Sequence, residues 1–241
     1  MSDVPNTLRV PSEAFPTITA ALREVKPFQT IHLTAPVYTE IVVISEATTN
    51  CNGPFVIEGC GPDATQLETK ETTVTILKHT VTIRNLSITV SQNPKPSSCV
   101  VADDSSVCII ENCDMSCYGD SAINSSRSSV LRVNSSTIRN CDYAICCYGI
   151  KCSITSSVFV DNGTMMYAPT CSDCFIEKCV IANNATGVFP SGYDYSGSMI
   201  LVNCALVNNE EDFATADDIV SPSLLGCVQM SVAGNDQDTL M

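Results

Sequence analysis

The feature that most constrains the fold of this chain is a short phrase that recurs along it. The segment "FIEKCVIANN" (residues 175–184) is preceded by "VNSSTIRNC" and "ITSSVFVDN" and followed by "LVNCALVNN". Aligning the copies on one aliphatic residue gives intervals of 26, 27, 23, 21, 22 and 25 residues between the anchors Ile57, Ile83, Ile110, Val133, Ile154, Ile176 and Leu201. A period of roughly 20–30 residues is typical of solenoids, in which each repeat forms one coil.

Three further columns of residues stay apolar from copy to copy. The residues two before the anchors are Phe55, Val81, Cys108, Leu131, Cys152, Cys174 and Met199. Five after the anchors from Ile83 onward stand Ile88, Met115, Ile138, Phe159, Ile181 and Leu206, and twelve or thirteen after the later ones stand Ile123, Ile145, Met166, Val188 and Phe213. Asn, Gly, Ser and Asp separate these columns as turn formers. The alternation indicates three short strands in each repeat, without helical periodicity.

This pattern predicts one all-β domain over residues 1–241, folded as a single-stranded parallel β-helix of seven or eight coils with 21–27 residues each. Each strand would pair in parallel with the strand of the next coil, about 4.8 Å away, so that like residues stack. A leucine-rich repeat has a similar period. It requires Leu at several fixed places and a regular length, whereas this chain has Ile, Val, Cys and Met there and a variable length.

Two recurrent polar features are expected at the turns. The position three after the anchor is shared by Cys60, Cys113, Cys179 and Cys204. A later turn is shared by the pairs Asn183, Asn184 and Asn208, Asn209, because Asn tolerates positive φ. Stacked amide side chains of this kind hydrogen-bond to one another from coil to coil.

The ends of a solenoid need caps, because the terminal coils leave strand edges and core residues open. In "FPTITAALREVKPF" the apolar residues fall at helical spacing and Pro27 ends the pattern, which predicts a capping segment at 12–26. We expect coils over 29–215, a C-terminal cap over 216–230 in which Leu224, Leu225 and Val228 cover the last coil, and a tail over 231–241.

The segments "FPTITAAL", "QTIHLTAPVYTEIVVI" and "FVIEGCGPDATQL" resemble the opening of right-handed parallel β-helix proteins of the pectin-lyase-like superfamily. The later "IENC" and "VNC" coils resemble repeats of carbohydrate-processing proteins and of the β-helix of certain F-box proteins. The resemblance spans about residues 15–215 and implies a right-handed β-helix with a short N-terminal capping helix. It implies no particular activity, since one fold hosts many functions.

The catalytic sets of enzymes in this superfamily are missing from the sequence. Pectin methylesterases are expected to carry two Asp, a Gln and an Arg-Pro-Trp segment, but this chain has neither Trp nor Arg-Pro. Polygalacturonases use clustered Asp, a Gly-His-Gly and an Arg-x-Lys, and the last two motifs are absent here. We therefore predict no catalytic, cofactor-binding or metal-binding residue, and we favour a protein that is not an enzyme.

Isolated candidates for chemistry have simpler interpretations. The acidic candidates Asp103, Asp104, Asp114, Asp142 and Asp161 fall at or beside predicted turns, where Asp is common, although the last three would share one groove. The basic candidates Arg132, Arg139 and Lys151 have no supporting motif. His32 and His79 are interpreted as strand residues, with His32 facing opposite to Ile31 and Leu33, and neither histidine suggests a triad.

Cysteine is abundant, with 15 residues, and in a reducing compartment these are expected to be free, buried thiols. Zinc needs four converging ligands. Cys171 and Cys174 form a single CxxC, and Cys146, Cys147 and Cys152 come one coil earlier. Because Cys152 and Cys174 share an inward column, core packing explains them without a metal.

The net charge of −14 disfavours nucleic acids and anionic membranes as partners, since both are negatively charged. No apolar run approaches the roughly 20 residues of a membrane-spanning helix. The start "MSDVPNTLRV" has neither the basic nor the apolar region of a secretory signal. The sequence thus predicts a cytoplasmic protein that is not secreted, and the acidic segment from Glu210 to Asp218 is interpreted as a solvated stretch.

Three functions agree with these observations. The favoured one is a non-catalytic, rigid interaction or structural module within a larger intracellular assembly, such as a cytoskeletal or ciliary one. The second is a carbohydrate-active protein, a lyase, hydrolase or glycan binder, whose sugar-stacking residues would come from Tyr118, Tyr143, Tyr148, Tyr167, Tyr193 and Tyr195. The third is a substrate-recognition module of a ubiquitin ligase, for which a separate F-box partner is needed.

Overall fold

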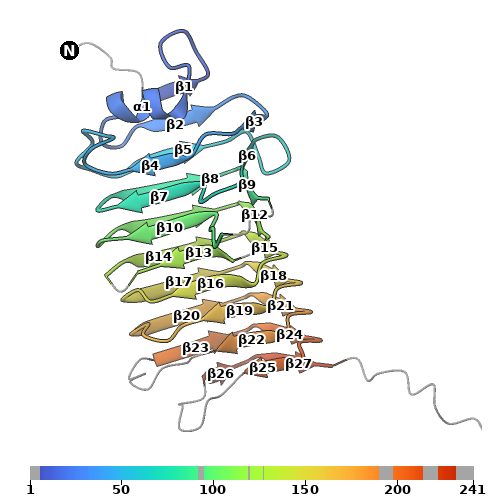
Figure 1. Ribbon diagram of the computed structural model, residues 1–241. Helices are drawn as coiled ribbons and strands as arrows, with labels where there is room; N and C mark the ends of the chain where they lie inside the picture. Colours follow the sequence, from blue (N-terminus) through green and yellow to red (C-terminus); the bar gives the residue numbers. More distant parts are fainter. Residues whose placement is uncertain are drawn as a thin grey trace, which may run out of the picture.

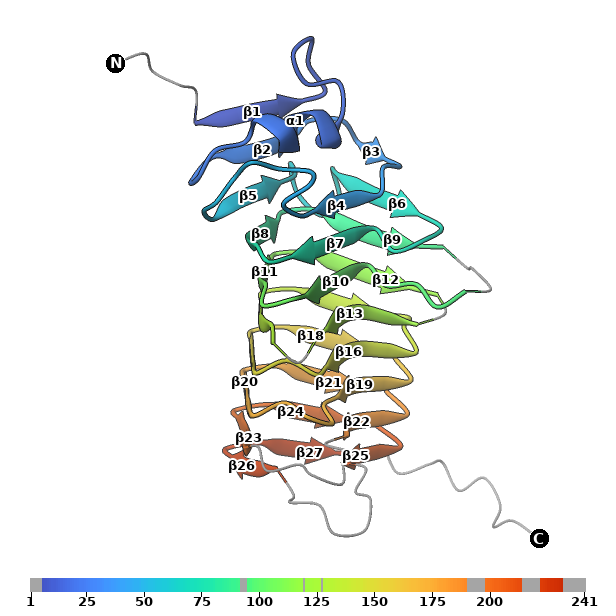
Figure 2. The same ribbon diagram turned by 60° about the vertical axis from the view of Figure 1, so that its left-hand side comes forward.

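The computed structural model describes residues 6–91, 95–118, 120–126, 128–189, 198–213 and 222–231. In these residues the chain winds through three parallel sheets, A, B and C, that enclose one elongated core (Figures 1 and 2). Each turn of the chain contributes one strand to each sheet in the order A, B, C. The architecture confirms the predicted parallel β-helix.

Sheet A has ten strands in the described ranges. They are β1 (Thr7–Val10), β2 (Thr30–Leu33), β5 (Phe55–Glu58), β8 (Thr80–Arg84), β11 (Val107–Glu111), β14 (Val130–Asn134), β17 (Lys151–Thr155), β20 (Asp173–Glu177), β23 (Ser198–Val202) and β26 (Ser223–Leu225). Their apolar residues alternate along each strand with half-buried or exposed ones, as expected where one sheet face covers a core.

The other two sheets complete each coil. The nine described strands of sheet B are β3 (Val37–Tyr38), β6 (Gln66–Thr69), β9 (Ser87–Val90), β12 (Asp114–Cys117), β15 (Thr137–Arg139), β18 (Val158–Val160), β21 (Val180–Ala182), β24 (Ala205–Val207) and β27 (Val228–Met230). The eight of sheet C are β4 (Val42–Ile44), β7 (Val74–Leu77), β10 (Val100–Asp103), β13 (Ser121–Ser125), β16 (Tyr143–Cys147), β19 (Thr164–Tyr167), β22 (Thr186–Phe189) and β25 (Glu211–Phe213).

The strand register confirms the predicted columns. In sheet A, Ile57 lies opposite Ile83, and every later anchor lies opposite the next one. The column extends beyond the predicted range, from Leu8 through Ile31 at one end to Leu224 at the other. Sheet B aligns the second column in the same way, from Ile88 to Leu206.

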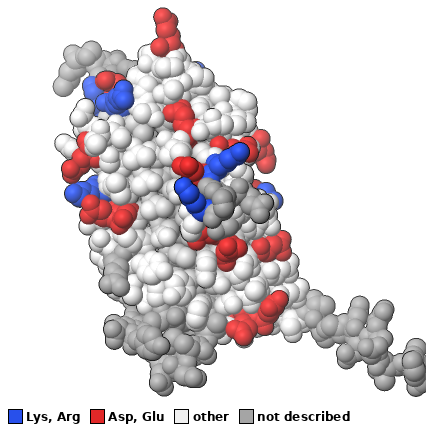
Figure 3. Space-filling model, in the orientation of Figure 1, with Lys and Arg blue, Asp and Glu red and all other residues white. Residues whose placement is uncertain are grey.

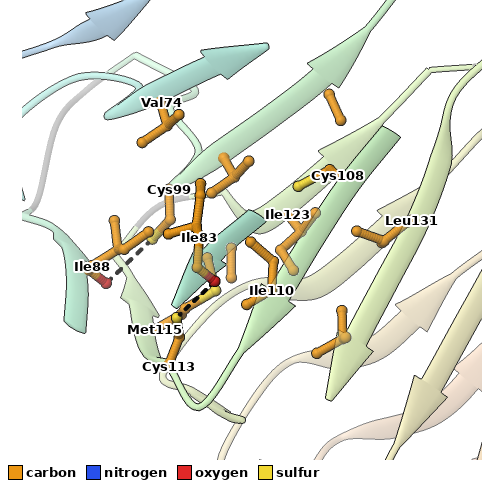
Figure 4. Close-up of a cluster of buried hydrophobic side chains, with 14 of the residues drawn as sticks. Val74, Ile83, Ile88, Cys99, Cys108, Ile110, Cys113, Met115, Ile123 and Leu131 are labelled. Carbon is orange, nitrogen blue, oxygen red and sulfur yellow. Dashed lines mark hydrogen bonds between the residues drawn. The ribbon is translucent and has the colours of Figure 1, made fainter. Parts of the chain in front are cut away.

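The inward columns form one continuous core. Figure 4 shows Ile83, Ile110 and Met115 among the apolar side chains that gather inside the coils, and all three are fully buried. Complete burial of a residue of this size stabilises the fold by about 1.5–3 kcal/mol. Repeated in every coil, this burial is the main source of stability.

The turn cysteines have a structural task. The thiols of Cys113, Cys179 and Cys204 each have two carbonyl acceptors within reach. One belongs to the residue two positions earlier, at 3.4, 3.3 and 3.4 Å, and the other to the anchors Ile83, Ile154 and Ile176, at 3.6, 3.9 and 3.6 Å (Figure 4 for Cys113). They thereby satisfy backbone groups at the corner between sheets A and B. All 15 cysteines are free, as the sequence predicted, and most are buried. Burial raises the pKa of Cys108 and Cys113 to about 12, so both remain neutral.

The predicted asparagine turns are present. Asn183 and Asn208 have φ of 53°, the left-handed conformation that Asn tolerates. The neighbouring Asn184 is buried, and its amide donates to the Phe159 carbonyl at 3.2 Å and to the Asn209 side chain at 3.0 Å. The side chain of Asn162 donates in turn to that of Asn184 at 3.0 Å, so a buried ladder links three coils.

Helix α1 (Ile18–Glu24) lies over the first coil and buries Ile18, Ala21 and Leu22, which confirms a capping helix inside the predicted segment 12–26 (Figure 1). The Thr17 side chain accepts from the Ala20 amide at its N-terminus. A second support at this end of the helix was not predicted. The Glu40 carboxylate accepts from the backbone amides of Ile18 and Thr19 at 2.9 and 3.2 Å.

Two expectations at the ends need correction. The coils are more numerous than the predicted seven or eight, with nine described strands in sheet B alone, because β1 precedes the helix and β26 and β27 follow the predicted coil range. Residues 223–230 are therefore not a cap in the described part. They form strands of a further coil, and Leu224, Leu225 and Val228 are 39%, 57% and 53% exposed. Residues 214–221 and the predicted tail from 232 lie outside the described residues.

Candidate functional site

The predicted acidic candidates do not converge on one groove. Asp114 lies on the outer face of β12, where Arg139 binds it through two hydrogen bonds of 2.8 and 3.2 Å. This contact raises the pKa of Arg139. Asp161 occupies a left-handed turn with φ of 57° and accepts from the Asn183 side chain at 3.3 Å. Asp142 precedes β16 and is exposed.

The remaining charged candidates also serve local structure. Asp103 accepts from the backbone amide of Asp104 at 2.7 Å, and Asp104 pairs with Lys78 at 3.5 Å, which agrees with their interpretation as turn residues. Arg132 and Lys151 are exposed on sheet A, whereas Arg139 is on sheet B. They do not form a common basic site.

The cysteine candidates pack together inside the core. Cys147 hydrogen-bonds with Cys152 and Cys171, and Cys174 hydrogen-bonds with the same two thiols. The pKa of Cys152 is raised by its hydrogen bonds with Cys147 and Cys174 and by burial, so its neutral form is favoured. Cys146 instead lies at an outward position of β16. Within the described ranges, no group of three or more His, Cys, Asp or Glu side chains is arranged to hold a metal ion.

The histidines differ from each other in their surroundings. His79 is buried, and its Nδ1 lies 2.6 Å from the Leu77 carbonyl oxygen, so it is a structural residue. His32 is half-buried and faces outward between the buried Ile31 and Leu33, as predicted. Contrary to the expectation that it has no nucleophile nearby, its Nε2 lies 3.9 Å from the Cys60 thiol.

The outer face of sheet B changes character along the solenoid. Over its last four described strands, β18, β21, β24 and β27, all eight outward positions are apolar. This apolar face consists of Val158, Val160, Val180, Ala182, Ala205, Val207, Val228 and Met230. Its residues stack in two straight columns, and the side chains of Val228 and Met230 are each 53% exposed.

The preceding four strands provide a matched contrast. The outward positions of β6, β9, β12 and β15 form the polar face, which consists of Gln66, Glu68, Ser87, Thr89, Asp114, Ser116, Thr137 and Arg139. The two faces occupy the same two columns, since Thr137 lies opposite Val158 and Arg139 opposite Val160. Both faces point away from the core, so core packing does not account for apolar residues on one face and polar residues on the other.

An acidic edge borders the apolar face where sheet B turns toward sheet C. Asp161 directly follows β18, and Glu210 and Glu211 follow β24; all three are exposed. Asp212 is also on this edge and accepts from the side chains of Asn209 and Gln229 at 2.9 and 3.0 Å. The first part of the acidic segment from Glu210 to Asp218 is thus part of a defined edge.

Sheet C has a second distinctive surface, the aromatic patch of Tyr143, Tyr148, Tyr167 and Phe189. The ring of Tyr167 is central, with centroids 5.9, 6.0 and 5.6 Å from those of Tyr143, Tyr148 and Phe189. The register explains the contact, since Tyr167 lies opposite Phe189 at outward positions of adjacent strands. Tyr118 is exposed after β12, and Tyr193 and Tyr195 are outside the described residues.

Two carboxyl groups lie near the aromatic patch. Burial, reinforced by the nearby Asp142, raises the pKa of Asp120, and Asp120 also contributes to the raised pKa of Tyr148, whose main cause is burial. The Ser121 hydroxyl donates to Asp120 at 3.3 Å. Asp120 was not a predicted candidate, because its closeness to Asp142 depends on the stacking of two coils.

The shape of the described surface includes two adjoining hollows beside β6. One, of about 490 Å³, is lined by Ile41, Glu68, Lys70 and neighbouring residues, and the other, of about 290 Å³, by Ile41, Glu71 and Lys95 among others.

On the face seen in Figure 3, Lys and Arg side chains lie over the upper coils. The described part of the chain contains no helix that is long and apolar enough to cross a bilayer.

Comparison with known proteins agrees with this architecture. A family model described as a right-handed beta helix region matches residues 73–228. The solved structure of AlyGC, an alginate lyase of the PL6 family, is similar with a TM-score of 0.59 and 10% sequence identity; the match covers 94% of this chain and 39% of the lyase chain. No curated protein matches the sequence.

The likeness to the lyase shows the fold alone at this low identity, and this chain spans less than half of the lyase's length. The family match covers most of the coils. It supports the resemblance to right-handed parallel β-helix proteins over the residues that it matches. The chain belongs to the right-handed β-helix family.

Proposed function

We propose that this chain is a non-catalytic interaction module that binds another protein through the apolar face of sheet B. The observation that supports this function is the run of eight apolar outward residues on four consecutive strands. A contiguous exposed apolar surface of this kind marks a contact site in soluble proteins. The parallel β-helix supplies a stiff and nearly flat support for it.

The surface also indicates the chemistry of the partner. The apolar face offers methyl groups and, on its last strand, the Met230 thioether, and the acidic edge of Asp161, Glu210 and Glu211 flanks it. A complementary partner therefore presents an apolar strip with Lys or Arg along one side. Burial of apolar area would supply most of the affinity, and the charges would set the orientation. We place such a contact in a larger intracellular assembly.

The test is the size of the complex in native extract from the source cells. We expect the wild-type chain to elute with a defined partner, and the double variant Val180→Asp, Val207→Asp to elute near its own mass of 25.7 kDa. The matched control is Ser87→Asp, Thr89→Asp, which adds the same charges to the same two columns on the polar face. The control should remain in the complex.

Binding measured with the purified partner then tests the chemistry. We expect the affinity to persist at roughly 0.5–1 M salt, because salt screens charges but does not weaken apolar burial. Glu211→Lys should weaken binding less than the double variant does. If the double variant remains in the complex, or the wild type elutes as a monomer, this docking surface is wrong. Ubiquitin-ligase subunits as the partner would favour the substrate-recognition function instead.

The aromatic patch favours glycan binding as a second candidate function. Aromatic rings stack on the apolar faces of sugars, and Tyr167 has rings on three sides. The carboxyl groups of Asp120 and Asp142 disfavour an acidic polymer such as alginate and favour a neutral glycan. A neutral-glycan array, with Tyr167→Ala as the variant and Tyr118→Ala as the control outside the patch, tests this function. Absence of any wild-type signal contradicts it.

A further inference from the structure

Three groups from neighbouring coils converge around an exposed thiol near the N-terminal end. All 15 cysteines lie in the described ranges, and Cys60, in the turn after β5, is the exposed one. Its Sγ lies 3.9 Å from Nε2 of His32 on β2. The other ring nitrogen of His32, Nδ1, lies 3.9 Å from Oε2 of Glu58. A nucleophile, a base and a carboxylate thus follow one another in a line.

The carboxylate of this arrangement is held in place. Oε1 of Glu58 accepts from Arg84 Nε at 2.9 Å and from Asn85 Nδ2 at 3.0 Å, both in the next coil. Its Oε2 is the atom that faces His32. A fixed carboxylate orients the imidazole and stabilises the protonated ring, which is its task in many Cys–His and Ser–His sites.

The turn that carries Cys60 is also fixed. The Cys60 amide donates to the Thr65 hydroxyl at 2.9 Å, and the next amide, of Gly61, donates to the Asn85 carbonyl at 2.8 Å. Gly59 packs against the next coil so closely that a Cβ there would lie 2.4 Å from the Asn85 carbonyl oxygen. The thiol itself lies 3.4 Å from the Leu33 carbonyl, which is an alternative acceptor for its proton.

We propose that Cys60 is a site of reversible mixed-disulfide formation with small-molecule disulfides, with His32 as its proton acceptor and Glu58 as the group that positions His32. His32 Nε2 takes the thiol proton, and the Cys60 thiolate attacks one sulfur of the disulfide. The S–S bond of the small molecule breaks as the Cys60 S–S bond forms. The leaving thiolate takes the proton from His32, so no further oxidant is required.

Other charged groups also face this site and belong to its pH response. Arg9 on β1 lies opposite His32 in the strand register, and Arg84 on β8 pairs with Glu58. Both guanidinium groups are in coils adjacent to the site. Tyr38 on β3 is close to Cys60; burial, reinforced by that thiol, raises the pKa of Tyr38, so the phenol stays neutral near pH 7.

The experiment follows the reaction of the whole, folded chain with 4,4′-dithiodipyridine, a neutral disulfide, between pH 5.5 and 9.5. We expect one fast phase at pH 7, assigned to Cys60 by peptide mapping and lost in Cys60→Ser. In His32→Gln this phase should slow by about tenfold or more at pH 7. It should approach the wild-type rate near pH 9.5, where an ordinary thiol ionises without a base.

Matched variants separate positioning from general structure. Glu58→Gln should slow the fast phase at pH 7 by a smaller factor, whereas Glu111→Gln, two coils further along the same outward column, should leave it unchanged. The proposal is overturned if Cys60→Ser retains the fast phase. It is also overturned if folded His32→Gln reacts as fast as the wild type at pH 7. Should His32→Gln fail to fold, a wild-type rate that rises about tenfold per pH unit between pH 7 and 8, as for a thiol without a base, would overturn it equally.

Discussion

The two halves of sheet B share one interior and have opposite exteriors. Inside, Ile88, Met115 and Ile138 of the first half continue into Phe159, Ile181 and Leu206 of the second without a break. Outside, the polar face becomes the apolar face between β15 and β18. Because the inward columns are equivalent in the two halves, core packing does not explain why the outward residues differ. A difference in what each half contacts would explain it. The difference supports a partner at the second half.

The corresponding halves of the whole solenoid, sheet A included, also differ in how their outer and turn residues link the coils. The first half uses charged pairs, Glu58 with Arg84 and Asp114 with Arg139. The second uses the buried amide ladder of Asn162, Asn184 and Asn209. Partly exposed ion pairs contribute about 0–1 kcal/mol each, whereas loss of a buried hydrogen-bonding group costs about 1–3 kcal/mol. The second half therefore depends more on its ladder.

The largest expected effect tests whether the interior is equivalent in both halves. Ile83→Ala and Ile176→Ala each remove a fully buried anchor side chain. We expect each to lower the free energy of unfolding by about 2–5 kcal/mol, through lost burial and a cavity. Urea unfolding monitored by circular dichroism measures both. A large cost in one half and almost none in the other would contradict the shared interior.

The ladder should give the next largest effect. Asn184→Ala removes the acceptor of the buried Asn162 backbone N–H and the side-chain bonds to Asn162 and to the Phe159 carbonyl, and we expect a loss of about 1–3 kcal/mol. The control is Asn134→Ala on β14, whose exposed side chain accepts from the Thr155 hydroxyl at 3.0 Å. Its cost should stay below about 1 kcal/mol. If both variants lose the same free energy of unfolding in the urea assay, the ladder stabilises the fold no more than an exposed hydrogen bond does.

An ion pair should matter less and should respond to salt. Arg139→Ala removes the two hydrogen bonds to Asp114, and because Arg139 is about half exposed we expect a loss of at most about 1 kcal/mol. The loss should shrink as the ionic strength rises from 0.05 to 0.5 M, roughly in step with screening. A loss of stability that does not change with salt would mean that the side-chain stem, rather than the charge, stabilises the first half.

The smallest effect concerns pH at the aromatic patch. The folded pKa of Asp120 is raised by burial and by Asp142, so its charged form opposes folding above that pKa. Asp120→Asn should therefore raise the melting temperature slightly at pH 7. The gain should fade as the pH drops through the folded and then the unfolded pKa, where the wild-type carboxyl is protonated in both states. A gain that persists at pH 3 would contradict this cause.

The sequence was sufficient for the architecture because the inward columns are enforced by packing in every coil. Ile57 to Leu201 could be aligned without any structure, and their register followed. The apolar face also lies at fixed positions in the sequence, four and six residues after the later anchors. The prediction was based on the inward columns and did not include these positions. The end of the chain was misassigned because Leu224 and Val228 suit a cap as well as a strand.

The candidate sites were less accessible to sequence reasoning because they join residues from different coils. His32, Glu58 and Cys60 meet only when β2 and β5 are placed in register, and that first coil was not among the aligned repeats. Phe189 joins Tyr167 for the same reason. Glu40 caps a helix 21 residues earlier without any local pattern that announces it. Such contacts depend on stacking rather than on spacing within a repeat.

The single helix at one end has a consequence for assembly. Parallel strands at an uncovered edge can accept another chain, and repeated addition at both ends would produce a fibre. In the described part of the chain, β1, β3 and β4 are the edge strands at one end and β25, β26 and β27 at the other, and α1 lies over the first coil. The seven residues of α1 therefore close the apolar interior at the N-terminal end, so another chain could meet strand edges there but not the core.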